Sequence, residues 1–327
     1  MSFLLLAIAD PDSALIKSSV ISSAVSRVPP EVRLVVTDKP EELKTHAPQA
    51  DAILYAHGQV SLLADILPLA TRARWIHSLW TGVESILIPE MLAHPAPLTN
   101  GRGVFRWPLA DWVVAVMLHY AFDFGRVLNQ QEEKLWKPFV STTLEGRSLG
   151  IVGYGAIGSA VAQRVRPFGV KIGALRRRPE LFQDDSLVDQ NYGPTQLGEL
   201  MSASDYVLVA TPLTPETRGL IGEEEIAAMK ASAVLINIGR GPVVDEEALV
   251  RALQSGAIRG AALDVFATEP LPPEHPFWGM RQVFLSPHTA DRVEGFLGPA
   301  FDCFLDNLAR FLKGSPLINV VDKRAGY

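Results

Sequence analysis

Three residues suited to proton transfer and carboxylate binding each follow an apolar run in the second half of the chain. Arg240 lies in INIGRGPVVDE, Glu269 in ALDVFATEP and His288 in FLSPHTA. Histidine titrates near neutrality, so His288 suits a proton carrier, and Glu269 beside it would orient the ring and favour its charged form. Arg240 can bind a carboxylate through its forked donors. With a hydride donor, this set predicts reduction of a 2-keto acid.

Each of these residues also has a structural interpretation when it is taken singly. His288 can be a hydrogen-bonded loop histidine, Glu269 a strand-end cap and Arg240 part of a surface turn. Ligands of open α/β sheets bind beyond the carboxyl ends of the strands, where all three residues are predicted to lie. The combination therefore favours one catalytic cleft.

The hydride donor is indicated by a strand, a glycine turn, a helix and a second strand within residues 149–179. The first strand ends in Gly153, Gly155 and Gly158, with GxGxxG spacing. The first glycine allows a tight turn, the second lets the backbone approach a pyrophosphate, and the third lets helix and strand pack closely. The helix N-terminus suits a diphosphate. We therefore predict a dinucleotide site, the alternative being a purely structural turn.

The end of the second strand indicates which dinucleotide binds. NAD-binding folds normally carry an acid about 20 residues after the glycines, where it bonds the ribose 2′-hydroxyl. This chain instead has Arg176, Arg177 and Arg178, whose guanidinium groups can hold a 2′-phosphate. NADP(H) is thus the expected cofactor and NAD(H) a possible one, unless the arginines are only a solvated strand end.

The composition is that of an ordinary globular protein. The 327 residues are 48% hydrophobic, which is enough for two domains. A net charge of −6 argues against nucleic acid as a partner. The single cysteine, Cys303, fits a reducing compartment, and the apolar start at residues 3–9 is too short for a membrane span. We expect a cytoplasmic protein with no membrane partner and no metal.

Short β-like runs alternate with helical patterns, which is typical of βαβ units and parallel sheets. Strands are predicted at residues 3–9, 32–37, 52–56, 74–78, 149–152, 170–175, 206–210, 234–237, 260–265 and 283–286. Helices are predicted at residues 13–27, 40–46, 61–70, 109–126, 159–168, 223–229, 246–255 and 295–312. The helix at 109–126 carries Asp111 in its predicted first turn, where a carboxylate suits the dipole.

Several motifs in the same order resemble the D-isomer-specific 2-hydroxyacid dehydrogenase family: GYGAIG, TPLTPETRGLI, INIGRGPVVDEEAL, GAALDVFATEPLPPEHPFW and SPHTA. They cover residues 149–290. The resemblance implies an α/β protein of two doubly wound parallel-sheet domains. A Rossmann cofactor domain at residues 99–291 would be inserted in a flavodoxin-like substrate domain made of residues 1–98 and 292–327.

The resemblance also implies roles for particular residues. Arg240 would bind substrate, Glu269 would be the acidic partner of the histidine, and His288 would be the acid/base. Asp264 would meet the nicotinamide carboxamide, and backbone N–H groups of Gly58 and Gly82 would bind the substrate carboxylate, with Thr81 beside them. The remaining cofactor contacts would be Ala156, Ile157, Thr211, Pro212, Thr217, Ile238 and Ala290. Family members are usually homodimers with the helix at residues 109–126 in the interface.

The leading prediction is an NADPH-dependent reductase of glyoxylate or hydroxypyruvate. One alternative is a non-catalytic dinucleotide sensor or corepressor on the same fold. Another is a D-lactate or aryl 2-keto acid dehydrogenase, with Trp80, Trp107 and Trp278 as candidate pocket walls. The chain departs from the family pattern after the histidine, where Asp291 and Arg292 follow Ala290.

Overall fold

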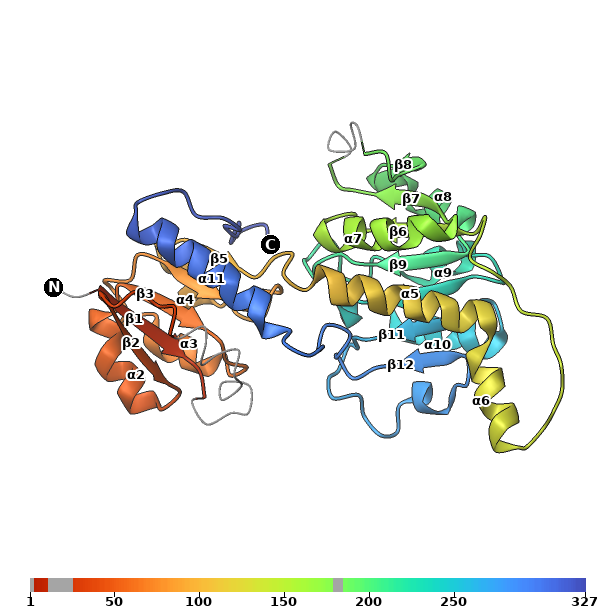
Figure 1. Cartoon of the computed structure of the whole chain (residues 1–327), viewed down its shortest axis with the longest axis horizontal. Helices are drawn as coiled ribbons and strands as arrows, with labels where there is room; N and C mark the ends of the chain where they lie inside the picture. Colours follow the sequence, from red (N-terminus) through yellow and green to blue (C-terminus); the bar gives the residue numbers. More distant parts are fainter. Residues whose placement is uncertain (1–2, 11–25, 179–184) are drawn as a thin grey trace. The chain divides into compact units, whose positions relative to one another are not determined.

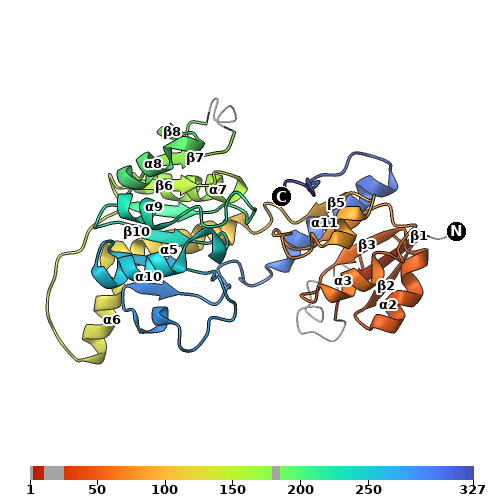
Figure 2. The same cartoon turned by 180° about the vertical axis from the view of Figure 1, so that it is seen from behind.

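The computed structural model describes residues 3–10, 26–178 and 185–327. The chain divides into two compact units, one made of Met1–Phe105 and Val293–Tyr327 and the other of Arg106–Arg292. Each unit is built on one parallel sheet (Figures 1 and 2), and the predicted fold class is thereby confirmed. None of the helices in the described ranges is long and apolar enough to cross a membrane.

The first unit has five parallel strands in the order β2-β1-β3-β4-β5, which is the flavodoxin-like order. They are β1 (Phe3–Ile8), β2 (Val32–Thr37), β3 (Ala52–Tyr55), β4 (Ile76–Ser78) and β5 (Leu98–Asn100). Leu4 to Ile8 are all buried, as expected for a strand covered on both faces. This burial explains why β1 is a continuous apolar run instead of an alternating one.

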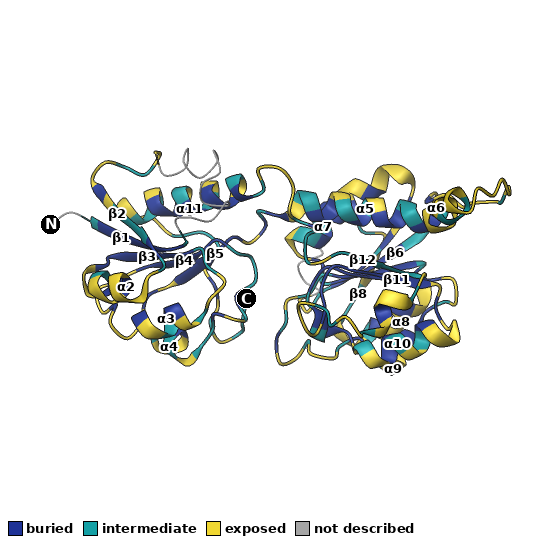
Figure 3. Cartoon of the chain, turned by 90° about the horizontal axis from the view of Figure 1, so that it is seen from below, coloured by how far each residue is buried: buried dark blue, intermediate teal, exposed yellow. Residues whose placement is uncertain are grey.

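Helices cover both faces of this sheet. On one face lie α2 (Pro40–His46), α3 (Ser61–Ile66) and α4 (Pro89–Ala93), and on the other lies α11 (Leu297–Leu312) (Figure 3). Trp75 stacks on Phe304 of α11 with ring centroids 5.6 Å apart. The last helix therefore completes the core of a unit that begins at the N-terminus. The helix predicted at residues 13–27 falls largely outside the described residues.

The second unit has seven parallel strands in the order β12-β11-β10-β9-β6-β7-β8. They are β6 (Ser148–Val152), β7 (Lys171–Leu175), β8 (Gln190–Tyr192), β9 (Tyr206–Val209), β10 (Val234–Asn237), β11 (Gly260–Leu263) and β12 (Val283–Leu285). The order reverses between β6 and β9. This doubly wound arrangement is that of a Rossmann fold, in which ligands bind at the reversal.

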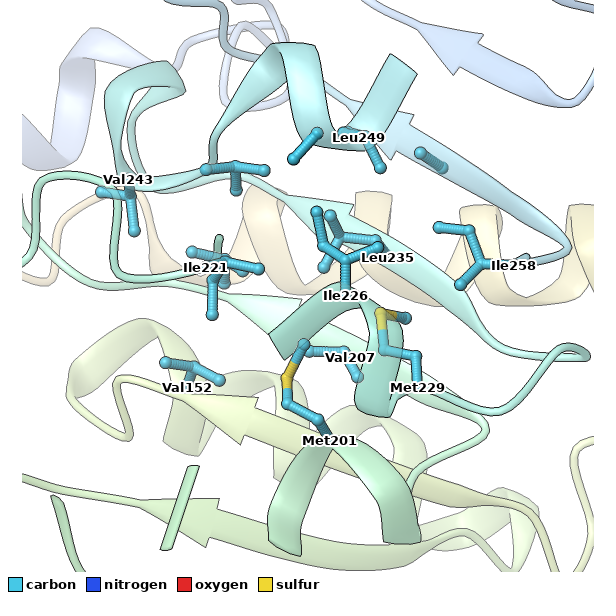
Figure 4. Close-up of a cluster of buried hydrophobic side chains, with 14 of the residues drawn as sticks. Val152, Met201, Val207, Ile221, Ile226, Met229, Leu235, Val243, Leu249 and Ile258 are labelled. Atoms are coloured by element: carbon cyan, nitrogen blue, oxygen red, sulfur yellow. The ribbon is translucent and has the colours of Figure 1, made fainter. Parts of the chain in front are cut away.

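Helices again lie on both faces (Figure 3). One face carries α5 (Arg106–Phe122) and α7 (Ala156–Val165), and the other carries α8 (Leu197–Ala203), α9 (Glu223–Ala228) and α10 (Glu246–Ser255). The second face buries an apolar cluster that includes Met201, Ile226, Leu235 and Leu249 (Figure 4). Short 3₁₀ helices lie at Ala47–Gln49, Arg166–Phe168, Pro194–Gln196, Gly241–Val243 and Pro276–Gly279.

The single helix predicted at residues 109–126 is wrong in extent. The structure has α5 and a separate α6 (Phe124–Glu132), because Asp123 adopts a left-handed φ of 53°. Such a backbone angle interrupts a right-handed helix. Since α5 begins at Arg106, Asp111 does not lie in its first turn. Its carboxylate instead accepts a hydrogen bond of 2.7 Å from Arg164 of α7.

Candidate active site

Arg240, Glu269 and His288 follow three strands that are neighbours in the sheet. They come after β10, β11 and β12 respectively, and these strands are hydrogen-bonded in that order. Carboxyl ends of parallel strands meet at one edge of a sheet, where ligands of this fold bind. The three predicted residues are thus brought to one end of the second unit.

His288 and Glu269 form a direct pair. The Nδ1 atom of His288 lies 2.7 Å from Oε2 of Glu269, and the other carboxylate oxygen accepts from the N–H of Phe266 at 2.9 Å. The carboxylate is therefore fixed by the backbone on one side and faces the imidazole on the other. With Nδ1 so engaged, Nε2 is the ring nitrogen that remains for a substrate.

An unusual backbone turn presents the imidazole. His288 has a φ of 52°, in the left-handed region that non-glycine residues rarely occupy. Its N–H donates to the carbonyl oxygens of Asp264 at 2.9 Å and Ser286 at 3.0 Å. A non-glycine residue held in this conformation by surrounding hydrogen bonds is a feature that recurs at functional sites.

The two members of the pair shift each other's titration. The hydrogen bond to Glu269 raises the pKa of His288 against the opposing effect of burial. Burial pushes the pKa of Glu269 upward, but the hydrogen bonds from His288 and Phe266 outweigh it and leave that pKa lowered. The pair therefore favours an imidazolium beside a carboxylate, which is a proton donor held in place.

Beside Arg240, two loops approach so closely that only glycine fits at position 241. A Cβ added to Gly241 would overlap the carbonyl carbon of Phe266, so the two loops touch through their backbones. The carbonyl oxygen of Arg240 accepts from the side-chain amide of Asn237 at 3.1 Å. The charge of Arg240 lowers the pKa of both Glu269 and His288, so the guanidinium acts electrostatically on both members of the pair.

Asp264 organises the turn that carries the histidine. Its Oδ1 accepts from the hydroxyl of Ser286 at 2.6 Å and from the N–H groups of Thr289 at 2.9 Å and Ala290 at 3.1 Å. The residue is almost completely buried, and burial raises the pKa of this carboxyl despite those hydrogen bonds. Asp264 thus ties the end of β11 to the turn after β12.

The glycine turn has the geometry that a dinucleotide requires. Gly153 has a φ of 96°, and a Cβ there would lie 2.7 Å from the side chain of Thr211. Gly155 caps α7, and a Cβ added to it would meet nothing within 4 Å, which leaves room for a ligand against the backbone. A Cβ on Gly158 would lie 3.0 Å from Ile151 of β6, so this glycine lets helix and strand pack closely.

The other predicted cofactor residues also lie in the second unit. Arg176 follows β7 and lies with its guanidinium carbon 4.7 Å from the centroid of the Tyr154 ring, while Arg177 is exposed. The hydroxyl oxygen of Thr211 is buried without a hydrogen-bond partner in the described part of the chain. Thr217 closes its own loop by donating to the carbonyl oxygen of Pro212 at 2.7 Å.

Four further predicted positions complete this set. Ala156 and Ile157 open α7, directly after the cap at Gly155. Ile238 and Ala290 are buried, and they lie close in sequence to Arg240 and His288.

The predicted substrate residues lie in the first unit, where Gly58 follows β3 and Thr81 and Gly82 follow β4. A Cβ added to Gly58 would meet nothing within 4 Å. No hydrogen bond from the N–H of Gly82 is found within the described residues. Both loops stand at the carboxyl edge of their own sheet, the edge at which such folds bind ligands.

One charged neighbour was not predicted as part of the site. Asp291 is half-buried, and burial raises its pKa while the charges of His288, Arg292 and Arg240 act in the opposite direction. The signal for it was its departure from the family pattern directly after Ala290. A further carboxyl group, besides Asp264, therefore lies in the electrostatic environment of the His288–Glu269 pair.

Comparison with known proteins gives a consistent result. A family model described as the NAD-binding domain of D-isomer-specific 2-hydroxyacid dehydrogenases matches residues 114–290. A glyoxylate reductase of Thermofilum pendens is 37% identical over 289 residues, covering 86% of this chain and 84% of that protein. A glyoxylate/hydroxypyruvate reductase B of Yersinia pestis is 32% identical over 294 residues, covering 87% and 88%.

A solved structure agrees along the whole chain. The crystal structure of a D-isomer-specific 2-hydroxyacid dehydrogenase from Xanthobacter autotrophicus Py2, in complex with NADPH and MES, is 29% identical. It has a TM-score of 0.83 and covers 100% of both chains.

Proposed function

This chain belongs to the D-isomer-specific 2-hydroxyacid dehydrogenase family of NAD(P)-dependent oxidoreductases, and on that premise we propose that it reduces glyoxylate and hydroxypyruvate with NADPH. The product of hydroxypyruvate would be the D-hydroxy acid. The observation that carries the proposal is the 2.7 Å contact between His288 Nδ1 and Glu269 Oε2, at the end of the sheet where Arg240 also stands.

Three residues of the chain have distinct roles in the proposed reaction. Arg240 binds the carboxylate and carbonyl oxygen of the keto acid through its paired N–H groups. His288 holds a proton on Nε2 and transfers it to the carbonyl oxygen, since Nδ1 is engaged by Glu269. Glu269 fixes the tautomer and orientation of the ring and stabilises its charge. A bound nicotinamide dinucleotide supplies the hydride.

The dinucleotide fits the glycine turn on several counts. Open space at Gly155 permits the pyrophosphate to approach the backbone, and the N-terminus of α7 favours its negative charge. The hydroxyl of Thr211 gains a partner if the ligand reaches it. Asp264 would meet the nicotinamide carboxamide. Ala156, Ile157, Pro212, Thr217, Ile238 and Ala290 would complete the contacts.

The preference for NADP(H) rests on Arg176 and Arg177. They follow β7, the strand whose end normally carries the ribose-binding acid. Two guanidinium groups can hold a 2′-phosphate through charge-assisted hydrogen bonds. NADPH in the Xanthobacter structure is in line with this assignment. NAD(H) remains the second cofactor of the proposal.

The two domains predicted from the family resemblance would have separate tasks. Residues 99–291 would form the dinucleotide domain, and residues 1–98 with 292–327 the substrate domain. The N–H groups of Gly58 and Gly82 would then bind the substrate carboxylate, with Thr81 fixing the second loop. A cytoplasmic location, as expected from the sequence, belongs to the same proposal.

A homodimer is also part of the proposal. Helix α6 and the segments beside it expose several large apolar side chains: Phe122, Phe124, Val127, Leu128, Leu135, Trp136 and Val140. Trp136 is 95% exposed and Val140 97%. These side chains lie close together in the sequence, and exposed apolar patches mark protein interfaces. It adjoins α5, which overlaps the helix that the family resemblance places in the dimer interface.

The test measures the oxidation of NADPH and of NADH through the absorbance of the reduced nicotinamide. The substrates are glyoxylate, hydroxypyruvate, pyruvate and phenylpyruvate. The proposal predicts turnover with the first two acids and NADPH. Tight NADPH binding without oxidation by any acid would instead indicate a dinucleotide sensor. Higher kcat/KM with phenylpyruvate would indicate an aryl 2-keto acid dehydrogenase.

A further inference from the structure

The loop that carries Thr81 and Gly82 is held by a second loop of the first unit. The side-chain amide of Asn100 donates to the carbonyl oxygen of Thr81 at 2.6 Å, and the Thr81 hydroxyl donates to the carbonyl oxygen of Gly101 at 2.9 Å. The N–H of Gly101 donates to the carbonyl oxygen of Trp80 at 3.1 Å. The conformation of residues 80–82 thus depends on the loop after β5.

That second loop is held in turn by the C-terminal segment. The side-chain amide of Asn319 donates to the carbonyl oxygens of Asn100 at 3.3 Å and Arg102 at 3.0 Å. The N–H of Asn100 donates back to the carbonyl oxygen of Asn319 at 3.2 Å. One asparagine near the end of the chain therefore clamps both sides of the loop that supports Thr81.

Asn319 is itself placed by two independent anchors. The completely buried Asn307 of α11 uses both atoms of its amide on the backbone of Ile318, at 3.0 Å and 2.9 Å. The N–H of Val321 donates to the carbonyl oxygen of Leu98 at 2.8 Å. Asn319 adopts a left-handed φ of 54°, which asparagine tolerates better than most residues. The backbone on both sides of Asn319 is thus held in place, and this fixes the direction of its side chain.

We propose that Asn319 is a positioning residue for substrate binding, acting through Asn100 on the Thr81–Gly82 loop. The inference rests on the proposed function, because it takes this loop to bind the carboxylate of the keto acid. Asn319 touches neither substrate nor cofactor in this account. It sets the direction of the backbone N–H groups that do so, and affinity for the keto acid then depends on the C-terminal segment.

The competing explanation is that the C-terminal segment only stabilises the unit, and Lys323 provides the matched control. Its ammonium donates to the carbonyl oxygens of Met91, His94 and Ala96 at 2.9, 2.7 and 2.9 Å. It anchors the same segment as Asn319 does, but to α4 and the residues after it and not to the loop after β5. Lys323→Ala thus loosens the segment without touching the proposed path.

The experiment compares Asn319→Gly with Lys323→Ala in the full chain. Glycine keeps the positive φ and removes the amide. We expect Asn319→Gly to raise KM for hydroxypyruvate roughly 3- to 10-fold, the worth of one or two hydrogen bonds. KM for NADPH and kcat should stay close to wild type, because the lost interaction serves substrate binding uniformly. Asn319→Asp, which keeps the size but lacks the donors, should behave in the same way.

Hydrogen exchange of the peptide spanning residues 79–84 gives a second readout that needs no activity. It should become faster in Asn319→Gly and remain unchanged in Lys323→Ala. Unchanged exchange in Asn319→Gly, or an equal rise of KM for hydroxypyruvate in both variants, would overturn the inference. A wild-type protein that reduces no keto acid would overturn the proposed function, while the exchange data would still decide whether Asn319 positions the loop.

Discussion

At the scale of single residues, the carboxylate of Glu269 changes the titration of the His288 imidazole. The His288–Glu269 hydrogen bond raises the pKa of His288, so the ring stays protonated to a higher pH than a free histidine. Reduction needs that proton. The reductase rate should accordingly be constant below the raised pKa of His288 and fall as the pH rises through it.

Replacing Glu269 by glutamine tests this coupling. Glu269→Gln removes the negative charge that raises the pKa of His288, so that pKa should fall and the protonated ring should be lost at a lower pH. The pH profile of kcat/KM for hydroxypyruvate should therefore descend at lower pH than in the wild type. A profile that descends at the same pH in both proteins would show that Glu269 does not tune the acid.

The cofactor preference is also decided by individual side chains. Arg176→Ala combined with Arg177→Ala should raise KM for NADPH roughly 10- to 100-fold, the worth of one or two charge-assisted hydrogen bonds. KM for NADH should change little, because NADH lacks the 2′-phosphate, and it serves as the internal control. Equal losses with both cofactors would assign the arginines a role in folding instead.

The sequence predicted only those site residues whose side chains have a recognisable chemistry and stand at the end of a predicted strand. Arg240, Glu269 and His288 were identifiable because each follows an apolar run, and the structure places them after adjacent strands. Asn319 carried no such signal. Its contact with Asn100 spans 219 residues of chain and exists only because α11 returns to the first sheet. Contacts of that kind depend on how distant parts of the chain pack together, and local sequence patterns do not predict them.

At the scale of elements, segments with a clear periodicity were mostly predicted well and short polar ones were missed. The strand at Val32–Thr37 and the helix at Glu246–Ser255 have the predicted bounds. Strands β5 and β8 have three residues each and contain polar side chains, so neither periodicity nor composition marks them. Helix α8 and the short α4 were likewise missed. The break between α5 and α6 comes from the left-handed backbone angle of Asp123, for which the sequence gives no signal.

The contact between the Arg240 and Glu269 loops yields a stability prediction. Gly241→Ala would place a methyl group against the carbonyl carbon of Phe266, where backbone on both sides cannot yield cheaply. We expect the free energy of unfolding to fall by about 3 kcal/mol or more, at the upper end of overpacking costs. Chemical denaturation of the purified variant measures this directly.

The control is a glycine with space around it. Gly198 lies in α8, is exposed, and would bring an added Cβ within 4 Å of nothing. Gly198→Ala should stabilise the protein by about 0.5 to 1 kcal/mol, because alanine favours the helix. A Gly241→Ala variant as stable as Gly198→Ala would contradict the steric account of the loop crossing.

At the scale of the whole molecule, strand order links the two units to their proposed tasks. The five-stranded sheet has flavodoxin-like order and the seven-stranded sheet has Rossmann order. Neither order can be read from alternating patterns alone, since these predict parallel sheets without saying which strand lies beside which. The family resemblance supplied the two fold classes, and the structure shows the strand order of each sheet.

The assembly prediction concerns the apolar surface of α6 and the segment that follows it. Leu128→Glu combined with Trp136→Glu should convert a dimer of 35.6 kDa chains into a monomer, because both side chains are exposed in the single chain. Light scattering coupled to size exclusion measures the mass. Leu92→Glu, a comparably exposed leucine of α4, should leave the dimer intact. A monomeric wild type would refute the assignment.

The most direct test of the account is steady-state NADPH oxidation with hydroxypyruvate by the wild type and by His288→Ala, with NADPH affinity measured by fluorescence in both. Loss of a positioned acid typically costs about 10²- to 10⁴-fold in rate. We predict that fall in kcat, D-glycerate as the wild-type product, and unchanged NADPH binding. Turnover by His288→Ala at the wild-type rate would contradict the claim that this imidazole protonates the substrate.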